Sequence, residues 1–370
     1  MGKVFVFSLL MILGMVISQT VDLTAVRPLL KFLLIAILGY IMIEVGLEFT
    51  LDKNKLKSYG KDYLIAMTAA AFPWILCGLY FWSCFNVNLT EAAIVARFAA
   101  PTSAGVLFSM LAAAGLASTW VFKKARILAI FDDLDTVLLI IPLQMLHLGL
   151  DWRAAVLLLI IIFLLFIAYR YLHMLRLPTS RLWLLAYALI LTVATEIFEK
   201  SALINIEIIL PAFVLGCVLA NPDIPNENNA SERQHAFIEA QKRYERMFDD
   251  AMKFVYMLLV GCSLPQISLG ATPFGFLAFH VLVLTFLANI GKLYPMLCYK
   301  QEATFRERAA LSVAMWPRGE VGAGILIVSM NYALSPVVIQ LAQLSLAVNL
   351  TLTGLFIYLV IWLLKAPRTA

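Results

Sequence analysis

Three carboxyl groups lie within four residues of an otherwise apolar stretch, at Asp132, Asp133 and Asp135. A second apolar stretch carries a single amine, that of Lys292. Neighbouring acids beside a cation titrate as one coupled set, whose protons leave in steps that belong to the whole set. Carboxylate, hydroxyl and carbonyl oxygens also suit hard cations rather than soft metals. These groups could therefore hold either a proton or a small cation, and competition between the two for one carboxylate is the chemistry of an exchanger.

Two other apolar stretches contain a proline near their middle, Pro101 in the sequence FAAPTSAG and Pro317 in the sequence WPRGE. A proline inside a helix removes a backbone hydrogen bond and clashes with the preceding turn. One interpretation is a simple kink, which membrane helices tolerate. The other is a true interruption, which would leave half-helix ends in mid-span, with the hydroxyls of Thr102 and Ser103 beside the first break as candidate ligands of the ion.

The second of these stretches also carries charge. Arg318 would fall beside the negative C-terminal end of the first half-helix. Glu320 would fall in the first turn of the second half, where the helix dipole favours an anion. We therefore expect both side chains to compensate the charges of half-helix ends.

The composition shows which elements must position these groups. Of 370 residues, 62% are hydrophobic and 14% are charged, and the mean hydropathy is +0.90. Soluble domains average about 45–50% apolar and about 25% charged residues, and a membrane span needs about 20 apolar residues. Apolar runs occur at 3–18, 28–49, 62–85, 91–118, 124–149, 153–170, 182–198, 205–220, 250–266, 271–299, 308–331 and 338–364. The sequence predicts an all-α polytopic membrane protein with about 12 transmembrane helices, which excludes a soluble enzyme or a nucleic-acid-binding protein.

The Lys and Arg residues predict the orientation of these spans. If the N-terminus is cytoplasmic, most of the 28 basic residues fall in cytoplasmic segments, as the positive-inside rule requires. We expect a multi-pass protein of the cell (inner) membrane, in contact with lipid, with both termini cytoplasmic. Residues 3–18 could alternatively be a cleaved signal peptide, which would leave the other spans unchanged.

A weak internal similarity relates the two halves of the chain. A constant shift superposes YIMIEVG at 40–46 on VYMLLVG at 255–261 and brings Pro101 next to Pro317. Both pairs lie an odd number of spans apart, so the matching helices run in opposite directions. Inverted-topology repeats with discontinuous helices around a midplane site are typical of transporters. The predicted fold is therefore an inverted repeat with crossed discontinuous helices, the fourth and the eleventh.

Counting from the loops places the polar features at similar depths. At about 1.5 Å per residue, the Asp pair, Lys292 and both prolines fall roughly 10–15 Å from a membrane surface. A central Asp costs about 2.5–3.5 kcal/mol on insertion, so three would cost roughly 8–10 kcal/mol without compensation. A structural ion pair of Lys292 with one Asp is an alternative explanation, but it cannot satisfy three carboxyls. Adjacent helical residues point about 100° apart, so one of Asp132 and Asp133 can pair with Lys292 while the other faces a cavity.

At these residues the chain resembles the monovalent cation:proton antiporter superfamily, and within it the bacterial sodium/proton exchangers. The resemblance rests on the paired-Asp helix ILAIFDD at 127–133, on NIGK at 289–292 and on MWPRGEV at 315–321, with a looser match of VGLE at 45–48. It covers nearly the whole chain, including the interruptions in the fourth and eleventh spans.

The resemblance implies roles for the charged residues. Asp133, with Asp132 beside it, would bind the transported Na⁺ or Li⁺, and Asp133 would be protonated in exchange. Asp132 and Lys292 would form an ion pair that breaks when the cation binds, and a lysine at this position implies electrogenic exchange of two protons per cation. No cofactor is implied, because the substrates are Na⁺ (or Li⁺ or K⁺) and H⁺.

The resemblance also divides the chain into parts. Family members form homodimers in which a six-helix core moves past a dimerisation scaffold. Here the core would be residues 62–149 and 267–370. The scaffold would be residues 1–61 and 150–266, including an amphipathic cytoplasmic connector at 222–249.

Three further charged residues are candidate members of the site. Asp135 is an extra carboxyl relative to the family pattern, and Arg97 is an extra cation just before the first interruption, with Asp135 or Glu320 as its candidate partner. Glu44 lies deep in the second span, where it lines either the scaffold or the site.

Other functions stay open at this stage. The first is K⁺/H⁺ exchange, because selectivity depends on the geometry of the ion cage. The second is a sodium-coupled organic-anion symporter of similar architecture, and the third is a regulatory or channel-like protein without turnover. The adjacent acids argue against the symporter, because an organic anion would need cationic or neutral helix ends.

Overall fold

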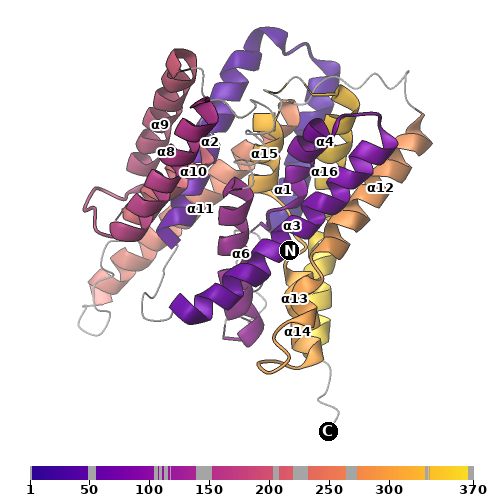
Figure 1. Cartoon of the computed structure of the whole chain (residues 1–370). Coiled ribbons are helices and arrows are strands. Elements are labelled where there is room, and N and C mark those ends of the chain that lie inside the picture. Colours follow the sequence, from indigo (N-terminus) through magenta and orange to yellow (C-terminus); the bar gives the residue numbers. More distant parts are fainter. Residues whose placement is uncertain are drawn as a thin grey trace. The chain divides into compact units, whose positions relative to one another are not determined.

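The computed structural model describes residues 2–48, 56–103, 107, 111, 116, 118–138, 152–202, 208–219, 232–263, 273–329, 332 and 334–365. In these residues the chain is mostly helical and forms no β-strand, apart from an isolated bridge between Leu175 and Leu219. Figure 1 labels the helices. They divide between a first unit of Met1–Ala25, Asp52–Leu150 and Val260–Ala370, and a second unit of Val26–Leu51 and Asp151–Leu259.

The first unit contains the segments that carry the predicted site. Its helices are α1 (Gly2–Thr20), α3 (Leu56–Cys84), α4 (Leu89–Ala96), the 3₁₀ helix η3 (Arg97–Ala99), α6 (Trp120–Leu138), α12 (Phe274–Gly291), α13 (Tyr294–Leu297), α14 (Phe305–Ala314), α15 (Glu320–Ser329) and α16 (Pro336–Lys365). α3 packs against α4, α6 and α12, and α16 packs against α1, α12 and α14.

The second unit contains α2 (Arg27–Glu48), α8 (Trp152–Arg170), α9 (Arg181–Ala202), α10 (Ile209–Val218) and most of α11 (Glu232–Cys262), with the short 3₁₀ helix η1 (Thr24–Val26) at its start. α2 packs along α9 and α10, and α10 also packs against α8 (Figure 1). The part of the predicted connector from residue 232 onward is the beginning of α11, which continues without a break into the ninth predicted span. Residues 222–231 of the connector lie outside the described residues.

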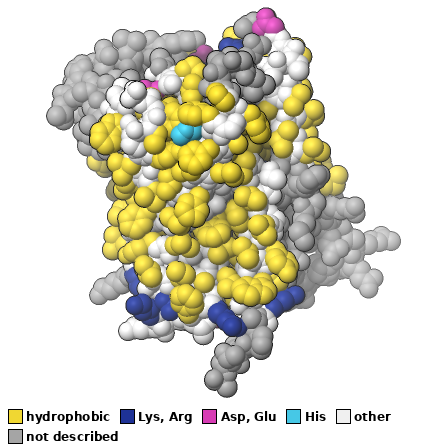
Figure 2. All heavy atoms as spheres, turned by 90° about the vertical axis from the view of Figure 1, so that its right-hand side faces the viewer, with side chains coloured by type: hydrophobic (Ala, Val, Ile, Leu, Met, Phe, Trp, Pro, Cys, Tyr) yellow, Lys and Arg dark blue, Asp and Glu magenta, His cyan; other side chains and the backbone are white. Residues whose placement is uncertain are grey.

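The helices follow the predicted spans. Each of the twelve predicted spans contains helix, which confirms the all-α polytopic fold. Among the described residues, five helical segments are long and apolar enough to cross a membrane: Arg27–Leu47, Gly60–Cys84, Arg181–Phe198, Phe274–Leu297 and Pro336–Lys365. In α12, the exposed large side chains recur at helical spacing, at Phe279, Leu282, Phe286 and Ile290. On the face drawn in Figure 2, hydrophobic side chains form a broad band with Lys and Arg along its lower edge, as expected of a surface in a bilayer.

Two helix starts near the predicted site are fixed by side-chain caps. The Asn88 side chain accepts a hydrogen bond from the backbone N–H of Glu91 at the start of α4. Thr304 and Glu307 form a capping box at the start of α14. Both arrangements satisfy N–H groups that have no partner within the helix.

A glycine allows α2 and α10 to cross closely within the second unit. A Cβ atom on Gly46 of α2 would lie 2.2 Å from the carbonyl oxygen of Phe213 and 2.9 Å from the amide nitrogen of Cys217. The glycine therefore meets the backbone of residues i and i+4 of α10. No side chain could be accommodated at this position without separating the two helices.

The same atomic pattern recurs within the first unit. A Cβ atom on Gly261, at the end of α11, would lie 2.2 Å from the carbonyl oxygen of Met11 and 2.7 Å from the amide nitrogen of Met15 on α1. Gly46 and Gly261 are equivalent in the predicted repeat, and their partner helices occupy the eighth and the first spans. The second helix of each half thus crosses the first helix of the other half, as an inverted repeat requires.

Candidate functional site

The first predicted interruption is a break in the helix rather than a kink. α4 ends at Ala96, one turn of 3₁₀ helix follows at Arg97–Ala99, and the backbone from Pro101 to Ser103 is not helical. All residues from 94 to 103 are buried. Carbonyl groups near the break are therefore presented to the protein interior, where they need partners.

The second predicted interruption is also a break. α14 ends at Ala314 and α15 begins at Glu320, with Pro317 in the non-helical segment between them. Glu320 is thus placed at the start of the second half-helix, as predicted, but its side chain lies outside the described residues.

The two breaks are hydrogen-bonded to each other. The backbone N–H of Ser103 donates to the carbonyl oxygen of Pro317 at 2.9 Å. The hydroxyl of Thr102 donates to the carbonyl oxygen of Met315 at 3.0 Å. α15 also approaches the first break closely, since a Cβ atom on Gly322 would lie 2.9 Å from the carbonyl oxygen of Phe98. Groups freed by one break are therefore satisfied by the other.

Lys292 joins α12 to both α6 and the first break. Its side chain is fully buried, and its ammonium donates to the two carboxylate oxygens of Asp132 at 2.7 and 2.6 Å. It also donates to the carbonyl oxygen of Ala100. An ammonium has three N–H donors, and here each has an acceptor.

Two features of α12 hold Lys292 in this position. A Cβ atom on Gly291 would lie 2.5 Å from the backbone nitrogen of Pro73, a residue within α3. Because Gly291 has no side chain, the backbone of α12 lies directly against the backbone and ring of Pro73 at this point of α3. Lys292 is also the C-cap residue of α12, where the negative end of the helix dipole favours a cation.

Arg318 ties the two breaks to α12 and α16. Its guanidinium donates to the carbonyl oxygens of Ala99 at 2.9 Å and Ala288 at 2.6 Å, and to the side-chain oxygen of Asn289 at 2.7 Å. The side chain of Asn349 accepts the backbone N–H of Arg318 at 2.9 Å and donates to Asn289 at 2.9 Å. Arg318 therefore compensates carbonyl groups at the end of η3 and near the end of α12. Its guanidinium also donates to one carbonyl oxygen of its own segment at 3.0 Å.

The three carboxyls of α6 are buried, and none is more than 4% exposed. Asp135 is hydrogen-bonded by the hydroxyl of Tyr63 on α3, and the Tyr63 ring packs edge-on against Phe131 with a centroid distance of 5.6 Å. Tyr63 is thus one partner of Asp135. The second carboxylate oxygen of Asp135 has no hydrogen-bond partner among the described residues.

The buried charges at this place balance. Arg97 is 1% exposed in η3, and with Lys292 and Arg318 it provides three buried cations. Asp132, Asp133 and Asp135 provide three buried carboxyls, so the charges of these six buried side chains sum to zero when all are ionised; the side chain of Glu320 lies outside the described residues and is not counted.

Glu44 is the predicted site residue that belongs to the second unit. It lies in the second unit, where its carboxylate is 3.2 Å from the ammonium of Lys253. In the same unit, Asp249 pairs with Arg181 at 2.8 Å and accepts a hydrogen bond from Tyr40. Glu44 therefore has its ion-pair partner within the second unit, where its side chain is partly buried.

Sequence reasoning did not identify Asn289, Asn349 or Tyr63. All three are uncharged polar residues within or at the edge of apolar spans, and this was the available signal. It is weak, because the insertion cost that drew attention to the Asp residues is much larger for charged groups.

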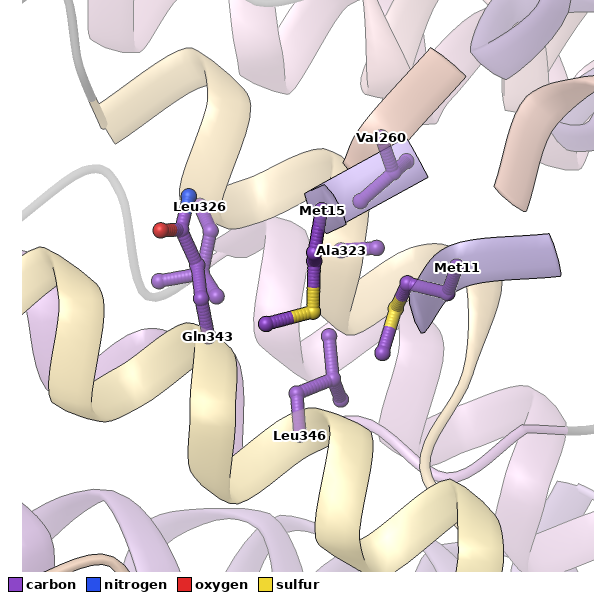
Figure 3. A pocket seen from close by; sticks show the side chains of 7 residues that line it. All are labelled: Met11, Met15, Val260, Ala323, Leu326, Gln343 and Leu346. Atoms are coloured by element: carbon purple, nitrogen blue, oxygen red, sulfur yellow. The ribbon is translucent and has the colours of Figure 1, made fainter. Parts of the chain in front are cut away.

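A small cavity in the first unit does not fit a cation. It lies among α1, the end of α11, α15 and α16, and Gln343 is the one polar residue in its lining (Figure 3). Its space is close to that of a single water molecule. Methyl and thioether groups cannot replace the hydration shell of a hard ion, so the Asp132–Lys292 region is the better candidate.

Comparisons with known proteins identify the family and the fold. The family model for the sodium/hydrogen exchanger, transmembrane, matches residues 1–362. The structure is similar to one of the sodium proton antiporter MjNhaP1 from Methanocaldococcus jannaschii at pH 8, with a TM-score of 0.61 and 15% identity over 97% of this chain and 92% of that chain. The search of curated proteins gave no match. Because the family model spans nearly the whole chain, the protein belongs to the sodium/hydrogen exchanger family, whose members are membrane transporters of cations and protons rather than enzymes.

Proposed function

We propose that the protein exchanges protons for Na⁺ or Li⁺ across the cell membrane, with H⁺ and the cation competing for the carboxylate of Asp133. The observation that carries this proposal is the buried ion pair of Asp132 and Lys292, which lies next to Asp133 on α6 and beside two broken helices. Oxygen atoms of carboxylates, hydroxyls and freed carbonyls are the ligands that a hard cation requires.

The balance of buried charges supports coupling between the two ions. These buried side chains balance only when Asp133 is ionised, so a proton on Asp133 already adds one positive charge to a region that excludes water, and a cation bound beside that proton would add a second. An uncompensated buried charge is costly, so release of a proton is the favourable response. Rebinding of a proton then favours release of the cation. Alternating access with such competition moves the two ions in opposite directions.

Lys292 is the proposed second proton carrier. A cation that binds Asp132 displaces the ammonium from its carboxylate, and burial disfavours an ammonium that has lost its partner. Its proton would then leave together with that of Asp133. Two protons per cation move one net charge in each cycle, which makes the exchange electrogenic.

The remaining expectations belong to the same proposal. The protein would work as a homodimer in the cell membrane with both termini cytoplasmic. A core of residues 62–149 and 267–370, with the broken fourth and eleventh spans crossing, would move past the rest of the chain. K⁺/H⁺ exchange is the nearest alternative, because the same ligands accept K⁺. An organic-anion symporter is disfavoured by three buried carboxyls at the site.

Transport by the purified protein in proteoliposomes tests the proposal. Uptake of radioactive Na⁺ under an imposed pH gradient is measured with Li⁺, K⁺ or organic anions as competitors, with and without a clamped membrane potential. We expect Na⁺ uptake that Li⁺ inhibits and that responds to the potential. Preferential inhibition by K⁺ would select the alternative, and uptake that requires an organic anion and no pH gradient would refute exchange.

A further inference from the structure

Tyr299, in the loop between α13 and α14, has an unusual backbone conformation. Its φ angle is 55°, in the left-handed region that bulky residues rarely adopt. Residues in such conformations persist where surrounding contacts hold them there. The contacts of Tyr299 therefore indicate what this loop is built to do.

Side chains from the starts of two helices hold Tyr299. Its hydroxyl donates to Asp62 of α3 at 2.7 Å, and Asp62 is only 2% exposed. Lys124 of α6 donates to both carboxylate oxygens of Asp62 at 3.1 Å. The ammonium groups of Lys124 and Lys61 lie 4.7 and 4.9 Å from the centre of the Tyr299 ring, and Trp120 packs edge-on against the ring with a centroid distance of 5.6 Å.

Glu302 closes this arrangement from the same loop. Its carboxylate is 2.7 Å from the ammonium of Lys61 and 3.2 Å from that of Lys124. The Tyr299 cluster (Tyr299, Asp62, Lys61, Lys124, Trp120 and Glu302) thus ties the α13–α14 loop to the first turns of α3 and α6. The attraction between each ammonium and the Tyr299 ring stabilises the cluster in addition to its hydrogen bonds.

The loop is mechanically connected to Lys292. Only the four-residue helix α13 and its flanking residues separate Lys292 from Tyr299. Arg308 of α14 donates to the carbonyl oxygens of Met296 at 2.8 Å and Cys298 at 3.4 Å, so α13, the loop and the start of α14 form one hairpin. A displacement of Tyr299 is therefore transmitted to the end of α12.

The Tyr299 cluster and the Asp132–Lys292 ion pair both link α6 to the segment that runs from the end of α12 through α13 to Tyr299. Lys124 and Asp132 both lie on α6. Lys292 is the C-cap residue of α12, and Tyr299 follows α13.

We propose that Tyr299 and Asp62 are positioning residues that hold Lys292 against Asp132 and thereby set the cation concentration needed for exchange. This inference rests on the proposed function. A transported cation must displace Lys292 from Asp132, so every contact that stabilises the ion pair opposes cation binding. Loss of the Tyr299–Asp62 hydrogen bond then makes the cation bind more tightly, whereas simple damage to the fold would weaken it.

Replacement of one hydroxyl tests this inference. Tyr299→Phe keeps the ring under the two ammonium groups and removes only the hydrogen bond to Asp62. The matched control is Tyr80→Phe, which removes the hydroxyl hydrogen bond from α3 to His280 of α12, far from the Tyr299 cluster along both helices. Asp62→Asn weakens the same contact from the other side, and the double variant shows whether Tyr299 and Asp62 act through one interaction.

Two measurements are made on the full-length protein. Hydrogen–deuterium exchange in detergent reports the mobility of residues 289–304. Proteoliposome transport gives the apparent KM for Na⁺ and the maximal rate. For Tyr299→Phe we expect faster amide exchange in residues 289–304 and a KM for Na⁺ lowered about three- to tenfold, which is less than the full effect of one hydrogen bond to a charged group because only part of that interaction is transmitted to Lys292. Tyr80→Phe should change neither, and the double variant should match the larger single effect.

The outcomes separate this inference from the proposed function. Unchanged amide exchange at residues 289–304 in Tyr299→Phe would overturn it, as would a KM that is unchanged or raised. Additive effects of Tyr299→Phe and Asp62→Asn would show that the two residues do not act as a pair. If the wild-type protein shows no cation-driven proton movement, the proposed function fails instead, and amide exchange still decides whether Tyr299 restrains the Lys292 segment.

Discussion

The ion pair of Asp132 and Lys292 is better explained by transport than by stability. Replacing a buried ion pair with apolar residues is often neutral or stabilising. A displaceable ammonium, in contrast, lets the Asp132 carboxylate stay satisfied when no cation is bound. The same comparison applies to the three buried carboxyls and three buried cations as a set. Apolar side chains in their place would often be neutral or stabilising, so their presence is better explained by transport than by stability.

Asp133→Asn should abolish exchange, because an amide neither carries the proton nor supplies the negative charge for the cation. The measurement is pH-gradient-driven Na⁺ uptake in proteoliposomes. Glu196→Gln is the control, since Glu196 lies exposed on α9 in the second unit. Wild-type flux in Asp133→Asn would remove Asp133 as the carrier.

Lys292→Met should destabilise the protein by about 3–5 kcal/mol, because it leaves the buried Asp132 carboxylate without its counter-charge. The double variant Lys292→Met with Asp132→Asn should recover most of this loss. Thermal unfolding in detergent measures both. Equal losses in the single and the double variants would mean that the pair is not an interacting unit in the folded protein.

Glu302 should make stability depend on acid pH. Partial burial acts to raise its pKa, but hydrogen bonds from Lys61 and Lys124 outweigh this and lower the pKa of Glu302 below its ordinary value of 4.5. A lowered pKa means that the contribution of Glu302 is present above pH 4.5 and is lost as the pH falls through the lower folded-state value.

Unfolding temperatures compared between pH 7 and pH 3 test this dependence. The difference between wild type and Glu302→Gln should be present at pH 7 and shrink below pH 4.5. A difference that stays constant down to pH 3 would show that the two lysines do not stabilise the ionised carboxylate.

At the scale of helices, the two glycine crossings show how the inverted repeat is assembled. Gly46 and Gly261 each meet the carbonyl oxygen of residue i and the amide nitrogen of residue i+4 on the partner helix. Three identical residues in the aligned segments are a match that chance can produce. The matching contacts of Gly46 and Gly261 with the backbones of their partner helices, in contrast, have a physical reason. Only glycine allows two helix backbones to approach this closely.

Gly261→Ala should destabilise the protein by about 1–3 kcal/mol, the usual cost of overpacking. The added methyl group would meet the backbone of α1 at 2.2 Å, so a helix must move. Gly354→Ala in α16 is the matched control, because a Cβ atom there meets nothing within 4 Å. Thermal unfolding of the two variants decides, and equal unfolding temperatures would contradict the close crossing.

At the scale of the whole molecule, the alternation of basic loops predicts which ends of the helices face the cytoplasm. The segment around Lys300 should be cytoplasmic, and the turn at Asn86, between α3 and α4, should face outward. Alkaline phosphatase fused after Asn86 should be active, and the same enzyme fused after Lys300 should be inactive. The reverse pattern would invert the predicted topology.

The features readable from the sequence are those that depend on near neighbours in the chain. Apolar length, alternating loop charge, prolines in mid-span and the acid cluster of α6 all follow from local composition, and the predicted all-α fold and family are confirmed. The ion-binding role of Asp133 stays a prediction. The long-range contacts could not be read in this way.

Asp62 and Tyr299 are 237 residues apart, and neither stands out in its own segment. Tyr63 reaches Asp135 from another helix, and Glu44, which has the same depth and charge as a site residue, instead pairs with Lys253 in the second unit. Because burying a charge is costly, a charged residue in an apolar stretch can be recognised from the sequence. Its partner depends on which helix faces pack together, and that packing exists only in the folded chain.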